Sequence, residues 1–373
     1  MGRAPLPKYI PELDGLRAIA ILLVLAMHSC GGFGRAIAAW TLHGWMGVDL
    51  FFVLSGFLIT GILLDTREDP NYFRAFYVRR ILRIWPLYYT ILVIAYVAIP
   101  HWSVWLTLDP ARRGYWPYHA LFVQNLVIRE LFFDPLVVTW SLAIEEQFYL
   151  VWPLLVRTVP AAALGRVLGG IIVASPVARW VTFLVTGLSA PVYMTTWCRL
   201  DGLAFGALVA WWVRQDGFAF AALRRRGLVA CGLAALVAAL PVEWPGARLM
   251  KGDVLVYSVV ALGFAGLLAL ALEGGPRDTQ LARVLRGRVL RYVGRISYGL
   301  YLWHPIVYSA VDHSRFVLLL PGNQRVVGSF VAQQAALFAV ASASWFFFEA
   351  PILRLKARWA PERQPPRSAT TAY

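Results

Sequence analysis

Arg17 and His28 stand eleven residues apart in the first hydrophobic segment of the chain, which reads LDGLRAIAILLVLAMHSCGGFG. On an α-helix of ~3.6 residues per turn this spacing is about three turns, so both side chains lie on one face, roughly 16 Å apart along the axis. An ionisable residue inside a bilayer costs on the order of a few kcal/mol and is a functional candidate for that reason. We therefore expect Arg17 near one membrane surface and His28 deeper, as parts of one reaction site.

Two further apolar segments carry carboxylates. Asp49 stands in GVDLFFVLSGFLIT, and a buried carboxylate needs a partner. Ser55 and Gly56 in the same segment are expected to let another helix approach closely. Glu145 and Glu146 in WSLAIEEQFYL are adjacent, so they point about 100° apart on a helix and at most one faces a site squarely. Asp49 and Glu145 are thus the carboxylates that we expect to take part in the reaction.

The segment FYVRRILRIWP holds three arginines, Arg79, Arg80 and Arg83. Arg79 and Arg83 are four residues apart, so we expect these two to share a face of the helix. Guanidinium groups bind phosphate in a bidentate way, so such a cluster suits a polyphosphate ligand such as a nucleotide. The other interpretation is an ordinary basic anchor at the cytoplasmic end of a membrane helix. Both interpretations stay open at this point.

Two later segments add more polar groups. CRLDGLAFGALVAWW carries Arg199 and Asp201, for which an ion pair that fixes the bundle is as good an interpretation as a role at the site. RISYGLYLWHP holds Ser297, Tyr301 and His304. A proline follows His304, so we expect a helix kink and a freed backbone group that needs a local partner. A structural hydrogen bond and a direct role are both open for His304.

Membrane helices must position these residues, because 59% of the chain is hydrophobic, only 15% is charged and the mean hydropathy is +0.61. Apolar stretches of about 20 residues predict membrane-spanning helices. We expect an all-α integral membrane protein with a bundle of about ten transmembrane helices. The expected spans are 16–33, 43–64, 84–105, 138–157, 167–187, 197–213, 227–240, 252–272, 292–312 and 326–348, with a re-entrant or interfacial piece at 115–129.

The basic residues are distributed unevenly between alternate connections. With a cytoplasmic N-terminus, 23 of the 35 Lys and Arg fall in cytoplasmic segments, 8 fall outside and four lie within spans. This positive-inside pattern places both termini in the cytoplasm of a multi-pass protein of the cell (inner or plasma) membrane. The net charge of +15 is then mostly a topology signal, with the anionic lipid of the bilayer as a secondary partner and no nucleic acid expected.

The domain organisation is simple. We expect one membrane domain at 1–358 and a Pro-rich, polar, disordered cytoplasmic tail at 359–373. We expect no soluble catalytic domain at either end, so any chemistry takes place inside the bundle. The three cysteines have no metal-binding or disulfide spacing.

Six motifs in order resemble the acyltransferase-3 family of integral-membrane acyltransferases over about 13–355. They are LDGLRAIA with its following histidine, GVDLFFVLSGFLIT, FYVRRILRIWP, WSLAIEEQFYL, CRLDGLAFG and ISYGLYLWHP. The resemblance implies about ten helices and transfer of an acyl group, often acetyl, from cytoplasmic acyl-CoA. Acceptors in the family include sugar hydroxyls of O-antigen, capsule, peptidoglycan, Nod factors and some macrolides. Many relatives carry a fused extracytoplasmic hydrolase-like domain, and this chain resembles the stand-alone type.

The resemblance maps the family's essential arginine–histidine pair to Arg17 and His28, its basic third-helix motif to Arg79, Arg80 and Arg83, and its WSL-x-x-E glutamate to Glu145. Together with the other residues singled out above, these form three expected sets. The catalytic set is His28, Arg17, Asp49 and Glu145; the set that binds the donor is Arg79, Arg80, Arg83, Ser297 and Tyr301; the supporting set is Asp14, Ser55, Arg199, Asp201 and His304. Acyl-CoA would serve as a substrate, with no permanently bound cofactor and no metal.

The chemistry of acyl transfer fits these residue types independently. Attack of a hydroxyl on a thioester carbon requires loss of the hydroxyl proton, and histidine, with an ordinary pKa near ~6.5, is the usual base at neutral pH. A carboxylate such as Asp49 or Glu145 would orient the imidazole and stabilise its charged form. Transfer through an acyl-histidine intermediate is equally open.

Two functions of other classes remain as alternatives. Buried charges and a broken helix also suit a transporter or flippase of a lipid-linked or small-molecule substrate, although no inverted repeat is evident. A non-enzymatic scaffold is the second alternative, but burying many ionisable residues in the membrane costs free energy that a scaffold would not put to use. Turnover of acetyl-CoA with release of free thiol distinguishes an acyltransferase from both.

Overall fold

The computed structural model describes residues 7, 9–99, 114–127, 135–215, 220–238 and 253–360, and within these ranges the regular structure is helical, with no strand. The long helices are α1 (Pro11–Ser29), α3 (Met46–Asp65), α4 (Tyr72–Val93), α8 (Trp140–Thr158), α9 (Ala161–Thr186), α11 (Leu200–Trp212), α12 (Phe220–Ala238), α13 (Asp253–Arg277), α15 (Arg288–Asp312) and α17 (Gly322–Ser344).

Short helices connect or extend the long ones. They are α2 (Arg35–Thr41), α6 (Trp116–Ala120), α10 (Ser189–Met194), α14 (Gln280–Leu285), α16 (Arg315–Leu318), α18 (Ala350–Arg354) and α19 (Lys356–Trp359). Two π-helical segments continue α4 and α17, η3 (Ile94–Ala98) and η8 (Trp345–Glu349). The expected re-entrant or interfacial piece holds α6 and the 3-10 helix η5 (Gln124–Leu126).

The all-helical membrane fold is confirmed, whereas the count of ten spans is not. Five stretches of the described residues are long and apolar enough to cross a bilayer: Arg35–Asp65, Tyr72–Ala98, Ala161–Thr186, Val254–Gly274 and Gln324–Trp359. Each of the ten expected ranges overlaps one long helix. Helix α11 is apolar but short, and α1 and α8 contain the charged residues of the expected site.

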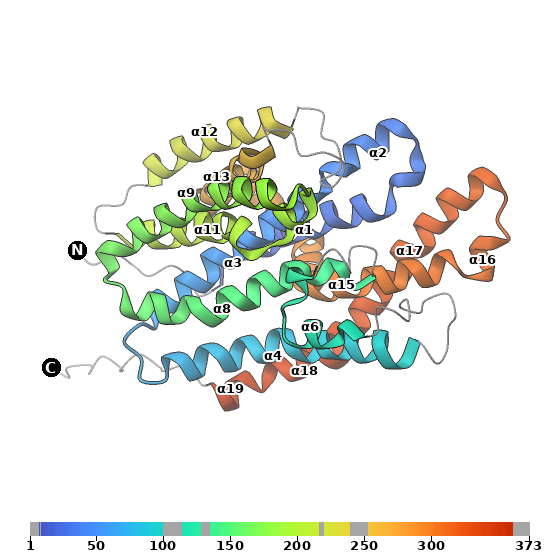
Figure 1. The fold of residues 1–373 in the computed structure, drawn as a ribbon, viewed down its shortest axis with the longest axis horizontal. Helices are drawn as coiled ribbons and strands as arrows, with labels where there is room; N and C mark the ends of the chain where they lie inside the picture. The colour runs from blue at the N-terminus through green and yellow to red at the C-terminus, as the bar shows by residue number, and fades with distance from the viewer. Residues whose placement is uncertain are drawn as a thin grey trace.

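The long helices run along the long axis of the molecule (Figure 1). Helices α9, α11, α12 and α13 gather on one side, α4, α18 and α19 lie on the other, and α1, α3, α8 and α15 lie between them. Glycines bring the central helices together: a Cβ at Gly56 would lie 1.9 Å from the backbone oxygen of Leu203, and one at Gly294 would lie 1.9 Å from that of Asp14. Helices α3 and α11, and likewise α1 and α15, therefore touch backbone to backbone.

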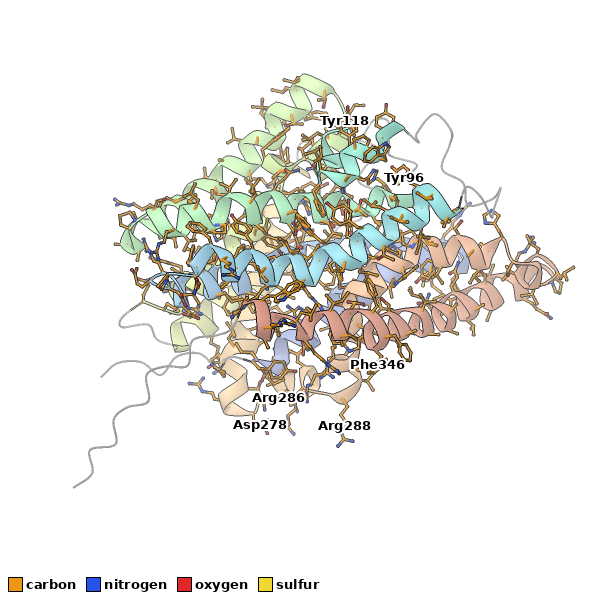
Figure 2. The ribbon with its side chains drawn as sticks, turned by 90° about the horizontal axis from the view of Figure 1, so that it is seen from below. Tyr96, Tyr118, Asp278, Arg286, Arg288 and Phe346 are labelled. Atoms are coloured by element: carbon orange, nitrogen blue, oxygen red, sulfur yellow. The ribbon has the colours of Figure 1, made fainter. Side chains whose placement is uncertain are left out.

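Basic residues cap the helices at one end of the bundle. Arg214 at the end of α11 forms two 2.7 Å hydrogen bonds to Asp65 at the end of α3, and Arg286 after α14 contacts Glu12 at the start of α1 at 2.6 Å. Arg286 also lies beside Asp278, which Figure 2 shows on the opposite side of the bundle from Tyr96 and Tyr118. Segments expected on one side of the membrane thus meet at one end.

The outer surface of several helices is apolar and uncovered by protein. In Ala161–Thr186 only 22% of the most apolar window is buried, and Val185 is 80% exposed. An apolar surface of this extent fits contact with lipid chains. The expected boundary between membrane domain and tail stays a prediction, because residues 361–373 lie outside the described part of the chain.

Candidate active site

A cavity of about 120 Å³ lies where α1, α3, α4, α8 and α15 converge. Its walls bring together seven of the residues expected at the site: Arg17, Ser55, Arg80, Arg83, Glu145, Ser297 and Tyr301. The remaining walls are mostly apolar or aromatic, from Val48, Phe51, Phe52, Ile84, Leu142, Tyr149 and Tyr298, together with Ser141. Motifs far apart in the sequence thus form one polar cavity.

The charge inside this cavity is unbalanced. Three guanidinium groups, those of Arg17, Arg80 and Arg83, face it together with a single carboxylate, that of Glu145. Arg17 is paired with Asp14 at 3.1 Å, and Tyr9 also donates to Asp14 at 2.7 Å. The cavity therefore has a positive excess that attracts an anionic ligand.

Arg80 and Arg83 contact the cavity in different surroundings. The buried Nε of Arg80 has no hydrogen-bond partner among the described residues. The guanidinium of Arg83 lies 5.8 Å from the ring centre of Tyr298 and 5.6 Å from that of Trp345, distances typical of cation–π contacts. Tyr298 is itself fixed because its hydroxyl donates to the backbone oxygen of Ile84 at 2.7 Å.

Sequence reasoning missed Tyr298 and Trp345. The signal for Tyr298 was its place directly after Ser297 in the motif RISYGLYLWHP. Trp345 opens the π-helical segment η8, and such segments occur frequently at functional sites.

The arginine motif divides between two environments. Arg79 is not among the residues that line the cavity, and its Nη2 donates to the backbone oxygen of Ala360 at 3.0 Å, beyond α19. Arg80 and Arg83 are three residues apart and share a face of α4. The structure therefore supports a cavity role for these two and places Arg79 elsewhere.

The adjacent glutamates of α8 also separate, as their spacing requires. Glu145 lines the cavity and accepts a 2.6 Å hydrogen bond from Ser55, whereas Glu146 accepts from the indole of Trp85 at 3.0 Å. Ser55 was expected to serve helix packing. Its neighbour Gly56 makes the close helix contact instead, and Ser55 holds the cavity carboxylate.

The far end of the cavity leads to the two histidines. The Tyr301 hydroxyl lies 2.7 Å from Ser141 and 2.5 Å from the backbone oxygen of Val138. One turn later, His304 is buried and its ring lies 4.9 Å from the ring of His28. His28 does not line the cavity, and it is exposed at the surface of the bundle. The ring of His304 therefore lies between His28 and the cavity-lining Tyr301, and His28 is accessible from outside the cavity.

The buried Asp49 pairs with Arg199 rather than with the imidazole of His28. Its Oδ1 lies 2.7 Å from Nη2 of Arg199, and both side chains are almost fully buried. The Arg199 guanidinium lies over the rings of Tyr257 and Tyr193, at 4.4 and 5.0 Å. The partner that this carboxylate needed is therefore a cation on α11.

Asp201 forms a second buried ion pair. It lies 2.9 Å from Nη2 of Arg179 on α9 and accepts from Ser258 on α13 at 2.6 Å. Arg199 and Asp201 were considered as one ion pair, but each binds a different helix. These pairs connect α3, α9, α11 and α13 beside the cavity and give both residues a structural position.

The comparisons with known proteins agree with this arrangement. The sequence profile described as an acyltransferase domain matches residues 10–349. The chain is 30% identical over 368 residues to the peptidoglycan O-acetyltransferase OatA of Listeria monocytogenes, covering 92% of this chain and 56% of that protein. It is 33% identical over 374 residues to the putative peptidoglycan O-acetyltransferase YrhL of Bacillus subtilis, covering 92% and 55%.

A putative O-acetyltransferase of Staphylococcus aureus is 28% identical over 390 residues, which cover 96% of this chain and 60% of that protein. The chain therefore spans little more than half the length of these relatives. No solved structure matches it. Because the family profile covers nearly all of the described bundle, this chain belongs to the acyltransferase-3 family.

Proposed function

We propose that this chain is a membrane-embedded O-acyltransferase that moves an acyl group, often acetyl, from acyl-CoA to a hydroxyl of a carbohydrate or glycosylated acceptor. The observation that carries the proposal is a cavity lined by Arg17, Arg80, Arg83 and Tyr301, in which the ring of Tyr301 neighbours that of His304 and His304 in turn neighbours His28. The names of the relatives favour peptidoglycan or a similar glycan as the acceptor.

The shape and charge of the cavity suit the donor. Its volume of about 120 Å³ is below the ~300–1,000 Å³ of sites that enclose drug-sized ligands, so it would take only part of acyl-CoA and not the whole nucleotide. Arg80 and Arg83 would bind the phosphates through charge-assisted hydrogen bonds. The adenine part would then remain toward the basic end of the bundle, and the thioester would point to Tyr301.

The hydrogen bonding of His28 leaves one ring nitrogen for chemistry. Its Nδ1 lies 2.8 Å from the backbone oxygen of Val24, and because a carbonyl only accepts, Nδ1 carries the hydrogen. Nε2 therefore holds the lone pair and can act as a base or nucleophile. As the acceptor oxygen attacks the thioester carbon, its proton moves to Nε2, the carbon–sulfur bond breaks and the CoA thiolate leaves. An acyl group carried transiently on Nε2 would use the same atom.

The sidedness follows from the charge of the bundle ends. Arg67 after α3 donates to the backbone oxygen of Val159 after α8, Arg214 after α11 binds Asp65 and Arg286 after α14 binds Glu12. We propose that this basic end of the bundle is cytoplasmic by the positive-inside rule. Donor binding would then be cytoplasmic and the acceptor would arrive from the opposite side, near His28. Arg17 and His28 lie about 16 Å apart along α1, a distance that an extended thioester arm can bridge.

A turnover assay tests the proposed function. The purified protein in lipid vesicles is mixed with radiolabelled acetyl-CoA and soluble peptidoglycan fragments, and both free CoA thiol and label in the glycan are measured. We expect thiol release that depends on the acceptor and label that enters the glycan as an ester. A transporter or flippase would leave the thioester intact, so absence of thiol release with every hydroxyl acceptor would overturn the proposal.

Labelling of single cysteines tests the sidedness separately. In a background without Cys30, Cys198 and Cys231, cysteine replaces either Trp40, which is 73% exposed in α2, or Arg74, which is exposed at the start of α4. A membrane-impermeant thiol reagent on intact cells should label only the cysteine at position 40. Labelling only at position 74 would show that the topology is the reverse of the one proposed.

A further inference from the structure

His304 is a buried histidine that the mechanism above does not yet use. It is 1% exposed and lies among three rings: His28 at 4.9 Å, and Tyr301 and Tyr308 at 5.8 Å each. His28 comes from α1, whereas both tyrosines belong to α15, the helix of His304 itself. The closest ring is therefore that of the proposed catalytic base.

Pro305 determines which ring nitrogen of His304 carries the hydrogen. Proline has no backbone N–H, so within α15 it cannot donate to the oxygen of Tyr301 four residues earlier. That freed oxygen lies 2.6 Å from Nδ1 of His304. Because a carbonyl only accepts, Nδ1 carries the hydrogen and Nε2 is left as an acceptor. Nε2 is buried and has no hydrogen-bond partner among the described residues.

His28 has the same arrangement, since its Nδ1 is bonded to the oxygen of Val24. Each of two neighbouring imidazoles thus has its Nδ1–H tied to its own helix and a free lone pair on Nε2. Two such rings can share one additional proton. A buried acceptor of this kind costs free energy unless a donor reaches it, and the imidazolium of His28, formed during the reaction, is such a donor.

We propose that His304 accepts the proton that His28 removes from the acceptor hydroxyl; this rests on the proposed acyl transfer. The O–H bond breaks, the oxygen bonds to the acyl carbon, the carbon–sulfur bond breaks and the sulfur leaves with the electron pair. The proton passes from Nε2 of His28 to Nε2 of His304 and ends on the thiolate sulfur. His304 acts through His28 and is therefore a positioning residue.

The position of His304 gives this transfer a direction. It lies between His28, which is accessible from outside the cavity, and Tyr301, which lines it. The thiolate forms on the cavity side, so the proton moves toward the group that needs it. The other ionisable groups near the pair are Tyr308 on α15, Cys30 directly after α1 and, beyond Tyr301, Glu145 on α8.

His304→Asn is the sharpest test, because the amide nitrogen of asparagine occupies the position of Nδ1 and keeps the bond to Tyr301, whereas nothing replaces Nε2. The control is His313→Asn, directly after the end of α15, where Nδ1 contacts the oxygen of Ser309 at 2.8 Å in an exposed setting. We expect His304→Asn to lower kcat about 10²-fold, within the range for a proton-transfer group, with the KM for acetyl-CoA unchanged. The pH profile of kcat should change, and His313→Asn should behave like the wild type.

A measurement on the unmodified protein keeps the test independent of whether the variant folds. In mixtures of light and heavy water, two protons moving together give a curved dependence of kcat on deuterium fraction, whereas one proton gives a straight line. We expect a curve for the wild type. A straight line in the wild type, or a His304→Asn protein with wild-type kcat and pH profile, would overturn the role of His304. Absence of acyl transfer in the wild type would instead refute the proposed function.

Discussion

Replacing Arg80 by alanine should weaken binding of acyl-CoA strongly, although its neighbour Arg79 should be dispensable. Arg80 lines the cavity, and its Nε has no partner among the described residues. A hydrogen bond from a charged group contributes about 1.5–3 kcal/mol. Since 1.4 kcal/mol corresponds to a factor of ten, we expect the Kd to rise roughly 10- to 150-fold. Arg80→Lys should recover only part of this, because lysine lacks the planar fork.

The matched change is Arg79→Ala. Its Nη2 bonds the backbone oxygen of Ala360 beyond α19, so its loss should affect the packing of that segment and leave the Kd for CoA within about twofold, well under the tenfold that 1.4 kcal/mol gives. Arg74→Ala, at an exposed position in the first turn of the same helix, controls for loss of one positive charge. Together the three variants separate a specific contact from a general electrostatic effect.

Isothermal titration calorimetry of CoA against each purified variant, at two salt concentrations, measures these differences. The reasoning is refuted if Arg79→Ala and Arg80→Ala lose affinity equally, because the structure places only one of them in the cavity. It is also refuted if Arg80→Ala binds CoA like the wild type, in which case the arginines serve only as topology anchors. A loss that disappears at high salt would indicate long-range attraction without a direct contact.

Three further predictions concern turnover and stability. His28→Ala should fold normally yet lose at least ~10²-fold in turnover of acetyl-CoA, and near-normal turnover in a well-folded protein would exclude His28 as base. Asp49→Asn should lower the free energy of unfolding by about 3–5 kcal/mol, because it leaves the Arg199 charge buried without its counter-ion; an unchanged Tm would contradict this. Gly56→Ala should reduce the yield of folded protein, since the new Cβ would lie 1.9 Å from a backbone oxygen of α11, whereas Gly170→Ala, with nothing within 4 Å, should have no effect.

Local spacing predicted how two adjacent glutamates diverge, because that geometry depends on a single helix. The adjacent glutamates had to point in different directions, and only Glu145 faces the cavity. The arginine motif could not be resolved in the same way. Spacing put Arg79 and Arg83 on one face, whereas Arg80 and Arg83 line the cavity. Arg79 instead bonds Ala360, which is 281 residues away in sequence. Spacing within α4 contains no information about that contact.

The partner of Asp49 shows the same limit of local patterns. A buried carboxylate predicted a partner, and from the sequence either Asp49 or Glu145 was expected to orient the imidazole of His28. The structure supplies Arg199, 150 residues away, on a helix that glycines bring into backbone contact with α3. The need for a partner was local, but its identity depended on which helices are neighbours.

Two of the helices that form the cavity have a membrane character that is hard to read from hydropathy. Helices α1 and α8 contribute Arg17 and Glu145 to the cavity, and neither is among the stretches apolar enough to qualify as a span by composition. Their polar side chains find partners inside the bundle, such as Asp14 for Arg17 and Ser55 for Glu145, so these groups need not face lipid. The charged residues of the proposed site therefore lower the hydropathy of α1 and α8, whereas α3 and α4 line the same cavity and remain apolar enough to span. Helix α9 presents the surface that fits lipid.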